Sequence, residues 1–265
     1  MSQASARSVP QTVIGEPHSN QKEPKMICPI ASASVLLLVL QSAPIDRSPV
    51  LPKAGCVIRV GTYGSGPSAE PQLEGEFWQC GRCQIEAPLP VGYPAPTPPG
   101  AIEIKAYPSV RRAEFSSTGN SGVGSFGAFW PLFNHIKERE IAMTSPVEMD
   151  YREMTRETDG LLDDRKGNWT MSFLYREAEL GPVGKDGQIA IVDTKPVTVL
   201  SIGLKGAYGM KRTNEGLRLL REWLDAHPGW TVVGEPRQFS YNGPGIRNAD
   251  KWSEVHLPVA LVAVK

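Results

Sequence analysis

Apolar and polar residues alternate along several segments of the chain. In residues 101–107, Ile102 and Ile104 alternate with Glu103 and Lys105. Successive side chains of a β-strand point to opposite faces of a sheet, so this period of two predicts a half-buried strand. The same period predicts further strands within residues 109–116, 141–151, 169–177, 189–206, 231–244 and 252–264.

Two other segments carry apolar residues at the spacing of a helix. An aromatic stripe occupies one helical face at Phe126, Phe129, Trp130, Phe133 and Ile136. A second stripe consists of Leu217, Leu220, Trp223 and Leu224. Residues three and four apart share one face of a helix, so each stripe predicts an amphipathic helix with a buried side. Pro131 lacks the backbone N–H that a helix interior needs, so the first helix is either kinked or begins later than its stripe.

The predicted elements follow the order strand, helix, strand, strand, and this order occurs twice after residue 100. The repeat predicts an internal duplication, with antiparallel strands and two helices packed on one side. The expected fold class is α+β, with a cleft between the halves as the ligand site. Pro146 cannot donate a hydrogen bond within a sheet, so its strand is expected at an edge or at a bulge.

The residues before position 100 differ in composition from the rest. Residues 26–43 are uncharged and largely apolar, which is typical of a signal peptide or of an N-terminal anchor. We therefore expect residues 1–25 to be a disordered leader and the protein to be exported, or tethered to a membrane by this segment alone. Residues 44–99 are rich in proline and glycine and predict a linker, so the folded domain is expected to comprise residues 100–265.

The charge of the chain does not indicate a nucleic-acid partner. Lys plus Arg and Asp plus Glu both total 28, so the formal net charge at pH 7 is zero. These totals give no general attraction to phosphate backbones or to acidic membrane surfaces. The charge alone therefore leaves the kind of partner open, and we expect no nucleic-acid partner.

Four cysteines bear on redox chemistry and metal binding. Cys28 lies in the apolar segment, Cys56 in the predicted linker, and Cys80 and Cys83 form a CxxC pair. A zinc site needs a second pair, or two histidines at ligand spacing, and the sequence offers neither. Gln84 stands where covalent haem attachment would need a histidine. In an exported protein the pair predicts a disulfide, either between Cys80 and Cys83 or with Cys56.

Three glycines precede the first predicted helix. Gly122, Gly124 and Gly127 match the GxGxxG pattern of dinucleotide-binding sites. The strand before them carries Arg111 and Arg112, whereas the first strand of a dinucleotide-binding domain is buried on both faces. We therefore interpret these glycines as a mobile loop that leads into the helix and could cover a groove.

Four segments together resemble the SOUL haem-binding protein family. The segment IAMTSPV, residues 141–147, is similar to the Met-Thr-x-Pro-Val motif of that family. Three further segments resemble family motifs in the same order: IEIKAYPSVRRAEF, WTMSFLY and SYNGPGIRNADKWSEVHLPV. The resemblance extends over roughly residues 100–265. It implies a distorted antiparallel barrel or sheet with two flanking helices, as in gyrase-inhibitor-like effector-binding domains.

The resemblance also implies a function. It predicts non-covalent binding, transport or sequestration of haem, or of another tetrapyrrole or planar hydrophobic molecule, in an apolar groove beside the first helix. An axial histidine is proposed for some members. His256 stands where the family often has tryptophan, so it is one candidate haem ligand, and His135 is the other. His256 alternates with core-type residues and is expected on a cleft or in solvent, whereas His135 is expected on the exposed side of its helix.

Further candidate ligand-binding residues come from several elements. Phe129 and Phe133 would form one wall of the groove, and Met143 and Met149 would offer soft side chains to the ligand. Ordinary core packing is the alternative for all four.

The charged candidates are Lys211, Arg212 and Glu254. Lys211 and Arg212 would pair with haem propionates, or would simply be solvated. Glu254 is costly to bury unpaired, so it either lies in the cleft or forms a surface ion pair. Two other functions stay open: an enzyme that acts on a tetrapyrrole or hydrophobic small molecule with Glu254 as acid or base, and an effector-binding or protein-interaction module. The sequence names no catalytic nucleophile with a positioned base.

Overall fold

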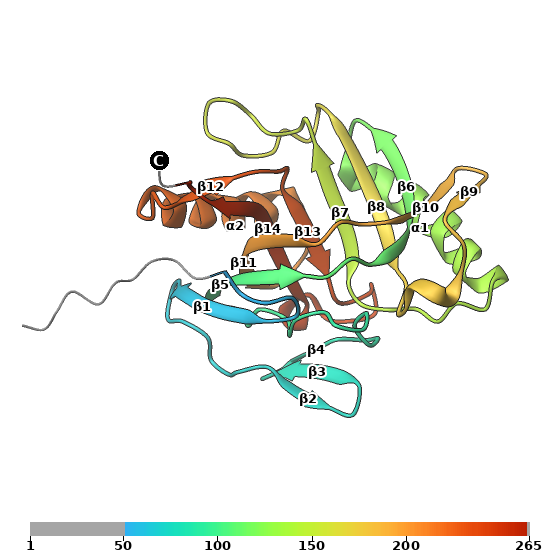
Figure 1. Cartoon of the computed structure of the whole chain (residues 1–265), viewed down its shortest axis with the longest axis horizontal. Coiled ribbons are helices and arrows are strands. Elements are labelled where there is room, and N and C mark those ends of the chain that lie inside the picture. The colour runs from blue at the N-terminus through green and yellow to red at the C-terminus, as the bar shows by residue number, and fades with distance from the viewer. Residues whose placement is uncertain (1–50, 264–265) are drawn as a thin grey trace, which may run out of the picture. The chain divides into compact units, whose positions relative to one another are not determined.

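Two helices and a large antiparallel sheet form most of the structure (Figure 1). The computed structural model describes residues 51–263, so the predicted leader, the signal segment or anchor, and residues 44–50 lie outside the described residues. The helices are α1 (Ser121–Glu138) and α2 (Met210–Asp225). Within residues 51–263, no helix has the length and apolar character needed to cross a membrane.

The strands form two sheets. The large sheet contains β1 (Val57–Thr62), β5 (Ala101–Tyr107), β6 (Arg111–Thr118), β7 (Val147–Arg152), β8 (Asn168–Leu174), β9 (Gly184–Asp186), β10 (Ile189–Asp193), β11 (Val197–Lys205), β12 (Trp230–Val232), β13 (Arg237–Ser240) and β14 (Trp252–Leu261). The small sheet contains β2 (Gln72–Glu74), β3 (Phe77–Cys80) and β4 (Cys83–Gln84).

The order of strands in the large sheet reflects the predicted duplication. The order is β1-β5-β11-β14-β13-β7-β8-β6-β10-β9, with β12 paired to β14. One half is β6-α1-β7-β8, the other is β11-α2-β13-β14, and they meet where β7 pairs with β13. The α+β class, the two helices and the repeat are therefore confirmed. The sheet stays open, with β1 and β9 at its ends, so it is a distorted sheet rather than a closed barrel.

The alternation along β14 decides which side chains face the helices. Val255, Leu257 and Val259 lie in the same core cluster as residues of α1 and α2. Glu254 and His256 point to the opposite face, as the period of two predicts. Both side chains are nevertheless fully buried, so the expectation that His256 borders an open cleft or solvent is wrong.

The expected linker is part of the fold from residue 57 onward. β1 pairs with β5 and extends the large sheet. Ile85 and Leu89 belong to a second core cluster, together with Phe239 and Trp252 from the face of the sheet opposite the helices. Prolines do not prevent this arrangement, because residues 85–99 lie across the sheet and need not donate to its ladder. This covering segment, residues 85–99, lies over Glu254, because the backbone N–H of Thr97 donates to the Glu254 carboxylate at 2.8 Å.

Helix α1 begins before the glycines that the sequence assigns to a loop. The backbone N–H and the hydroxyl of Ser121 both donate to Asp164 Oδ1, at 3.0 and 2.7 Å. This bond satisfies a donor that the first turn of a helix otherwise leaves unpaired. Asp164, 43 positions later in the chain, thus stabilises a helix start that the glycines of the local sequence disfavour.

The strand around Pro146 lies in the middle of the sheet, so its predicted edge position is wrong. β7 begins at Val147, directly after Pro146, and pairs with β13 on one side and β8 on the other. The missing N–H of the proline lies outside the ladder and therefore breaks no bond of the strand.

Candidate functional site

An aromatic cluster lies on the surface of α1. The side chain of Trp130 is 61% exposed, and it contacts Phe129 and Phe133 edge to face, with ring centroids 5.8 and 6.0 Å apart. Phe129 and Phe133 stack at 6.0 Å and are themselves half-buried against the helix-side core. Lys137 is exposed one turn beyond Phe133. We call Phe129, Trp130 and Phe133 the aromatic face.

His135 lies on the same helix but does not belong to this surface. Its side chain is buried, so the expectation that it is exposed is wrong. Its Nδ1 lies 2.7 Å from Asp186 Oδ2, and its Nε2 lies 2.8 Å from the hydroxyl of Tyr175. Both ring nitrogens therefore have protein partners.

Glu254 is the centre of a buried polar network on the opposite face of the sheet. Its side chain is fully buried and forms an ion pair of 2.8 Å with the equally buried Lys105. Its other donors within 2.8 Å are Thr97 N, the hydroxyls of Ser201 and Tyr241, and His256 Nε2. Burial alone would raise the pKa of Glu254, but the Lys105 charge and the His256 bond lower it well below the usual value. Glu254 is therefore a satisfied carboxylate that no substrate reaches in this structure.

The hydrogen bonds of His256 define its tautomer. Arg237 Nε donates to His256 Nδ1 at 3.1 Å, so Nδ1 accepts and the ring proton lies on Nε2. That proton points to Glu254 Oε2, 2.7 Å away. Burial lowers the pKa of His256 from 6.5 to about 4, although Glu254 acts in the opposite direction. His256 is thus a neutral bridge between two charged residues.

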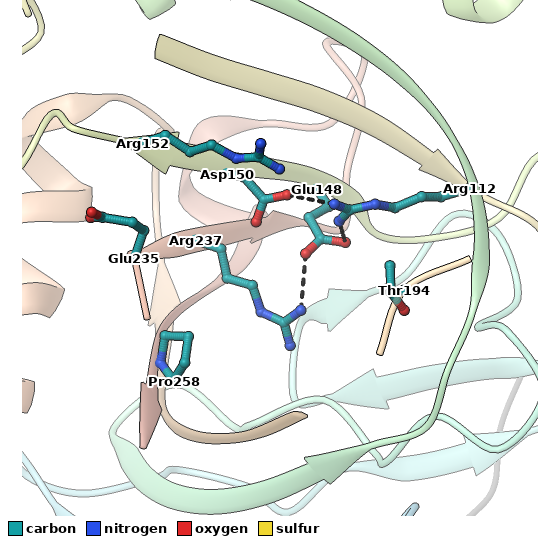
Figure 2. A pocket seen from close by; sticks show the side chains of 8 residues that line it. All are labelled: Arg112, Glu148, Asp150, Arg152, Thr194, Glu235, Arg237 and Pro258. Carbon is teal, nitrogen blue, oxygen red and sulfur yellow. Dashed lines mark hydrogen bonds and ion pairs between the residues drawn. The ribbon is translucent and has the colours of Figure 1, made fainter. Parts of the chain in front are cut away.

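A second ion cluster lies beside this network (Figure 2). The two carboxylate oxygens of Glu148 each lie 3.0 Å from an arginine nitrogen, one from Arg112 and one from Arg237. Arg112 also pairs with Asp150 at 2.9 Å. Burial and the neighbouring Glu148 charge raise the pKa of Asp150 from 3.8 to about 6. The cluster borders a pocket of about 310 Å³ lined by Arg112, Glu148, Asp150, Arg152, Thr194, Glu235, Arg237 and Pro258.

The described cysteines are free thiols, contrary to the predicted disulfide. Cys80 and Cys83 lie opposite each other in the β3–β4 hairpin, and both are buried, whereas Cys56 is exposed. Burial raises the pKa of the Cys80 thiol to about 11, and it also raises that of Cys83. Within residues 51–263, no three His, Cys, Asp or Glu side chains gather in a way that could hold a metal ion.

The sequence matches a family model over most of this fold. The model describes the SOUL heme-binding protein and matches residues 94–258, more than half of the chain. The chain belongs to the SOUL heme-binding protein family. The matched range begins within the covering segment and includes both helices, so the SOUL domain of this chain contains Thr97 as well as Glu254.

Solved structures of low sequence identity are similar to this chain. The SOUL domain is similar to the EcmrR chain in the cryo-EM structure of the EcmrR–DNA complex, with 14% identity and a TM-score of 0.50. The match covers 61% of this chain and 57% of that one, so this chain spans little more than half the length of that protein. A hydrolase from Listeria innocua matches with 11% identity over 63% of this chain and 94% of its own, at a TM-score of 0.47. A search of curated proteins found no match.

The structure brings some of the candidate residues together and separates others. Phe129, Phe133 and Met143 pack at the edge of the helix-side core, and Met149 lies inside it. Lys211 and Arg212 lie in the first turn of α2, in the other half of the SOUL domain, and Arg212 pairs with Glu215.

Several residues of the buried network were absent from the sequence-based candidates. They are Thr97, Lys105, Arg112, Glu148, Ser201, Arg237 and Tyr241. A partial signal was available, because polar residues recur at every second position of the predicted strands, as at Glu148 and Asp150. The covering segment that turns this polar face into a buried one carried no such signal.

Proposed function

We propose that this SOUL domain binds haem, or another planar hydrophobic tetrapyrrole, on the aromatic face of α1. The observation that carries the proposal is the exposure of Trp130, which is 61% accessible although it contacts two other aromatic rings. A grouped and exposed aromatic surface is typical of an interaction site rather than of an isolated surface residue. Membership of a heme-binding family supports haem as the ligand.

The chemistry of this surface suits a flat ligand with acidic substituents. Ring stacking and burial of apolar area supply affinity, at roughly 25 cal/mol per Å² before ordering costs. Lys137 lies seven residues after Trp130, close to the same line along the helix, and its ammonium group would pair with a propionate.

Axial ligation by histidine is not part of this proposal. The two ring nitrogens of His135 and those of His256 are engaged in hydrogen bonds, and both side chains are buried. Ligation by either residue would require these bonds to break. The proposed complex is therefore held by burial and charge, and its absorption spectrum should survive substitution of either histidine.

A carrier or sequestering role fits this mode of binding better than catalysis does. Glu254, the acid or base of the alternative enzymatic function, is enclosed by its own donors. We further propose that the N-terminal apolar segment exports the protein or tethers it to a membrane. This segment lies outside the described residues, and its role rests on the sequence pattern alone.

Titration of the full chain with haemin, followed by absorbance and tryptophan fluorescence, tests the proposal. We expect saturable one-to-one binding that Trp130→Ala weakens by about five-fold or more, as the loss of about 1 kcal/mol of aromatic contact predicts. Phe77→Ala is the matched control, since Phe77 is an exposed aromatic residue on β3. Binding that is non-saturable, or equally strong in the wild type and in Trp130→Ala, would refute the site.

A further inference from the structure

The pocket beside Glu148 lies on the face of the sheet that is opposite the aromatic face. Met149 and Tyr151 of β7 pack into the core beneath the helices, so the alternating residues Glu148 and Asp150 point to the other side. The pocket has a volume of about 310 Å³, which is at the lower end of the range for small-molecule sites. Any ligand there would be small and would bind separately from a planar molecule on α1.

One buried donor in the wall of this pocket has no hydrogen-bond partner among the described residues. Arg237 is 8% exposed, its Nε donates to His256, and its Nη1 donates to Glu148 Oε1 at 3.0 Å. Its Nη2 is buried and makes no hydrogen bond. In Figure 2 the guanidinium group lies between Pro258 and Thr194, with its free nitrogen on the side away from Glu148. An unsatisfied buried donor costs about 1–3 kcal/mol, so an incoming acceptor would be stabilising here.

The rest of the pocket offers groups of both signs. Arg152 is exposed at its rim, and the hydroxyl of Thr194 can donate, because its oxygen already accepts from the backbone N–H of Val110 at 3.0 Å. Glu235 is exposed at the rim too, and its Oε2 accepts a bond of 3.3 Å from Thr155. The lining therefore contains donors that suit a carboxylate and acceptors that suit a cation.

The charges of the pocket residues balance. Its lining contains three arginines and three carboxylates, so a simple anion or cation gains little from the pocket as a whole. A ligand that carries both charges gains from both kinds of group. We propose that this pocket is a second ligand site, which takes a small zwitterion with a carboxylate and an ammonium group, such as an α-amino acid. Its carboxylate would lie against Arg237 and Thr194, and its ammonium group against Glu235 and Asp150.

The test follows the NMR signals of the backbone amides and of arginine Nε in the ¹⁵N-labelled full chain. L-Leucine is the probe, and acetate and ethylammonium, each carrying one of its two charges, are added in separate titrations. We expect leucine to shift the signals of Arg152, Thr194 and Arg237 saturably, and each fragment to bind at least ten-fold more weakly. No saturable shift with leucine, or acetate binding as tightly as leucine, would overturn the proposal.

A rim substitution keeps the test clear of folding defects. Glu235→Gln changes an exposed side chain and should weaken leucine binding about five-fold, as the loss of one charge-assisted contact of about 1 kcal/mol predicts. Arg165→Ala is the control, because the side chain of Arg165 is 88% exposed and lies outside the pocket. Equal binding by these two variants would also overturn the proposal. Trp130→Ala should leave leucine binding unchanged, so failure of the haem site and failure of this site can be told apart.

Discussion

Lys105 and Glu254 form an ion pair of 2.8 Å in which both side chains have no exposure to solvent. The pair joins β5 to β14 across β11, because each of these strands pairs directly with β11. Removing two charges from water costs several kcal/mol per ion, and this cost is offset only when the remaining hydrogen-bonding positions are filled. Thr97, Ser201 and Tyr241 fill those of Glu254.

Glu254→Gln should lower the free energy of unfolding by about 3–5 kcal/mol, because it leaves the Lys105 charge buried without a partner. Urea denaturation followed by circular dichroism measures this loss. The double variant Glu254→Gln, Lys105→Met removes the stranded charge and should recover part of the stability. If the double variant loses as much free energy of unfolding as the two single variants lose together, the two charges are not coupled.

His256 should make stability depend on pH. Its pKa is about 4 in the folded protein and near 6.5 when unfolded, so only the unfolded chain binds this proton between these values. The contribution of His256 to the free energy of unfolding is up to about 3 kcal/mol. It is complete above pH 6.5 and is lost as the pH falls towards 4. Asp150 acts oppositely, since its pKa rises from 3.8 to about 6, and its contribution is lost as the pH rises through 6.

Two variants separate these contributions. His256→Gln should flatten the fall in unfolding free energy between pH 7 and pH 5, and Asp150→Asn should steepen it. Nitrogen chemical shifts of the His256 ring provide a direct check and should report the neutral tautomer with its proton on Nε2 at pH 5.5. A protonated ring at that pH would contradict the buried, neutral bridge.

The thiols should differ in reactivity. Cys56 is exposed, whereas Cys80 and Cys83 are buried and have raised pKa values, which lowers the fraction of reactive thiolate. Iodoacetamide at pH 8, followed by peptide mass spectrometry, should label Cys56 in the folded protein and the other two only after denaturation. Equal labelling of all three before denaturation would contradict the burial of the hairpin.

Asp164→Ala should destabilise the protein by about 1 kcal/mol, the usual cost of losing a helix cap. Asp164 accepts both hydrogen bonds from Ser121 at the start of α1, so the first turn of that helix should become less protected from amide exchange. Asp163→Ala is a matched control, since Asp163 bonds only to its neighbour Arg165 among the side-chain contacts of the described residues. Similar exchange in both variants would show that the cap is not needed.

The local pattern of residues determined the kind and order of the elements. Alternation along β14 predicted that Val255 and Leu257 face the core and that His256 faces the other way, and the structure confirms this. The stripes of α1 and α2 predicted two amphipathic helices in the same manner. These predictions succeed because strand and helix periods depend only on neighbouring residues.

Only the tertiary structure decided whether the polar face of the sheet is open or closed. Thr97 bonds to Glu254 across 157 positions of the chain, and Asp164 caps a helix that starts 43 positions earlier. Residues 85–99 are rich in proline, which disfavours ladder bonds whether the segment is free in solvent or packed on the sheet. Their composition therefore predicts a linker in both cases. Their apolar residues Ile85 and Leu89 become buried because the sheet offers Phe239 and Trp252 as partners, and no local pattern specifies that contact.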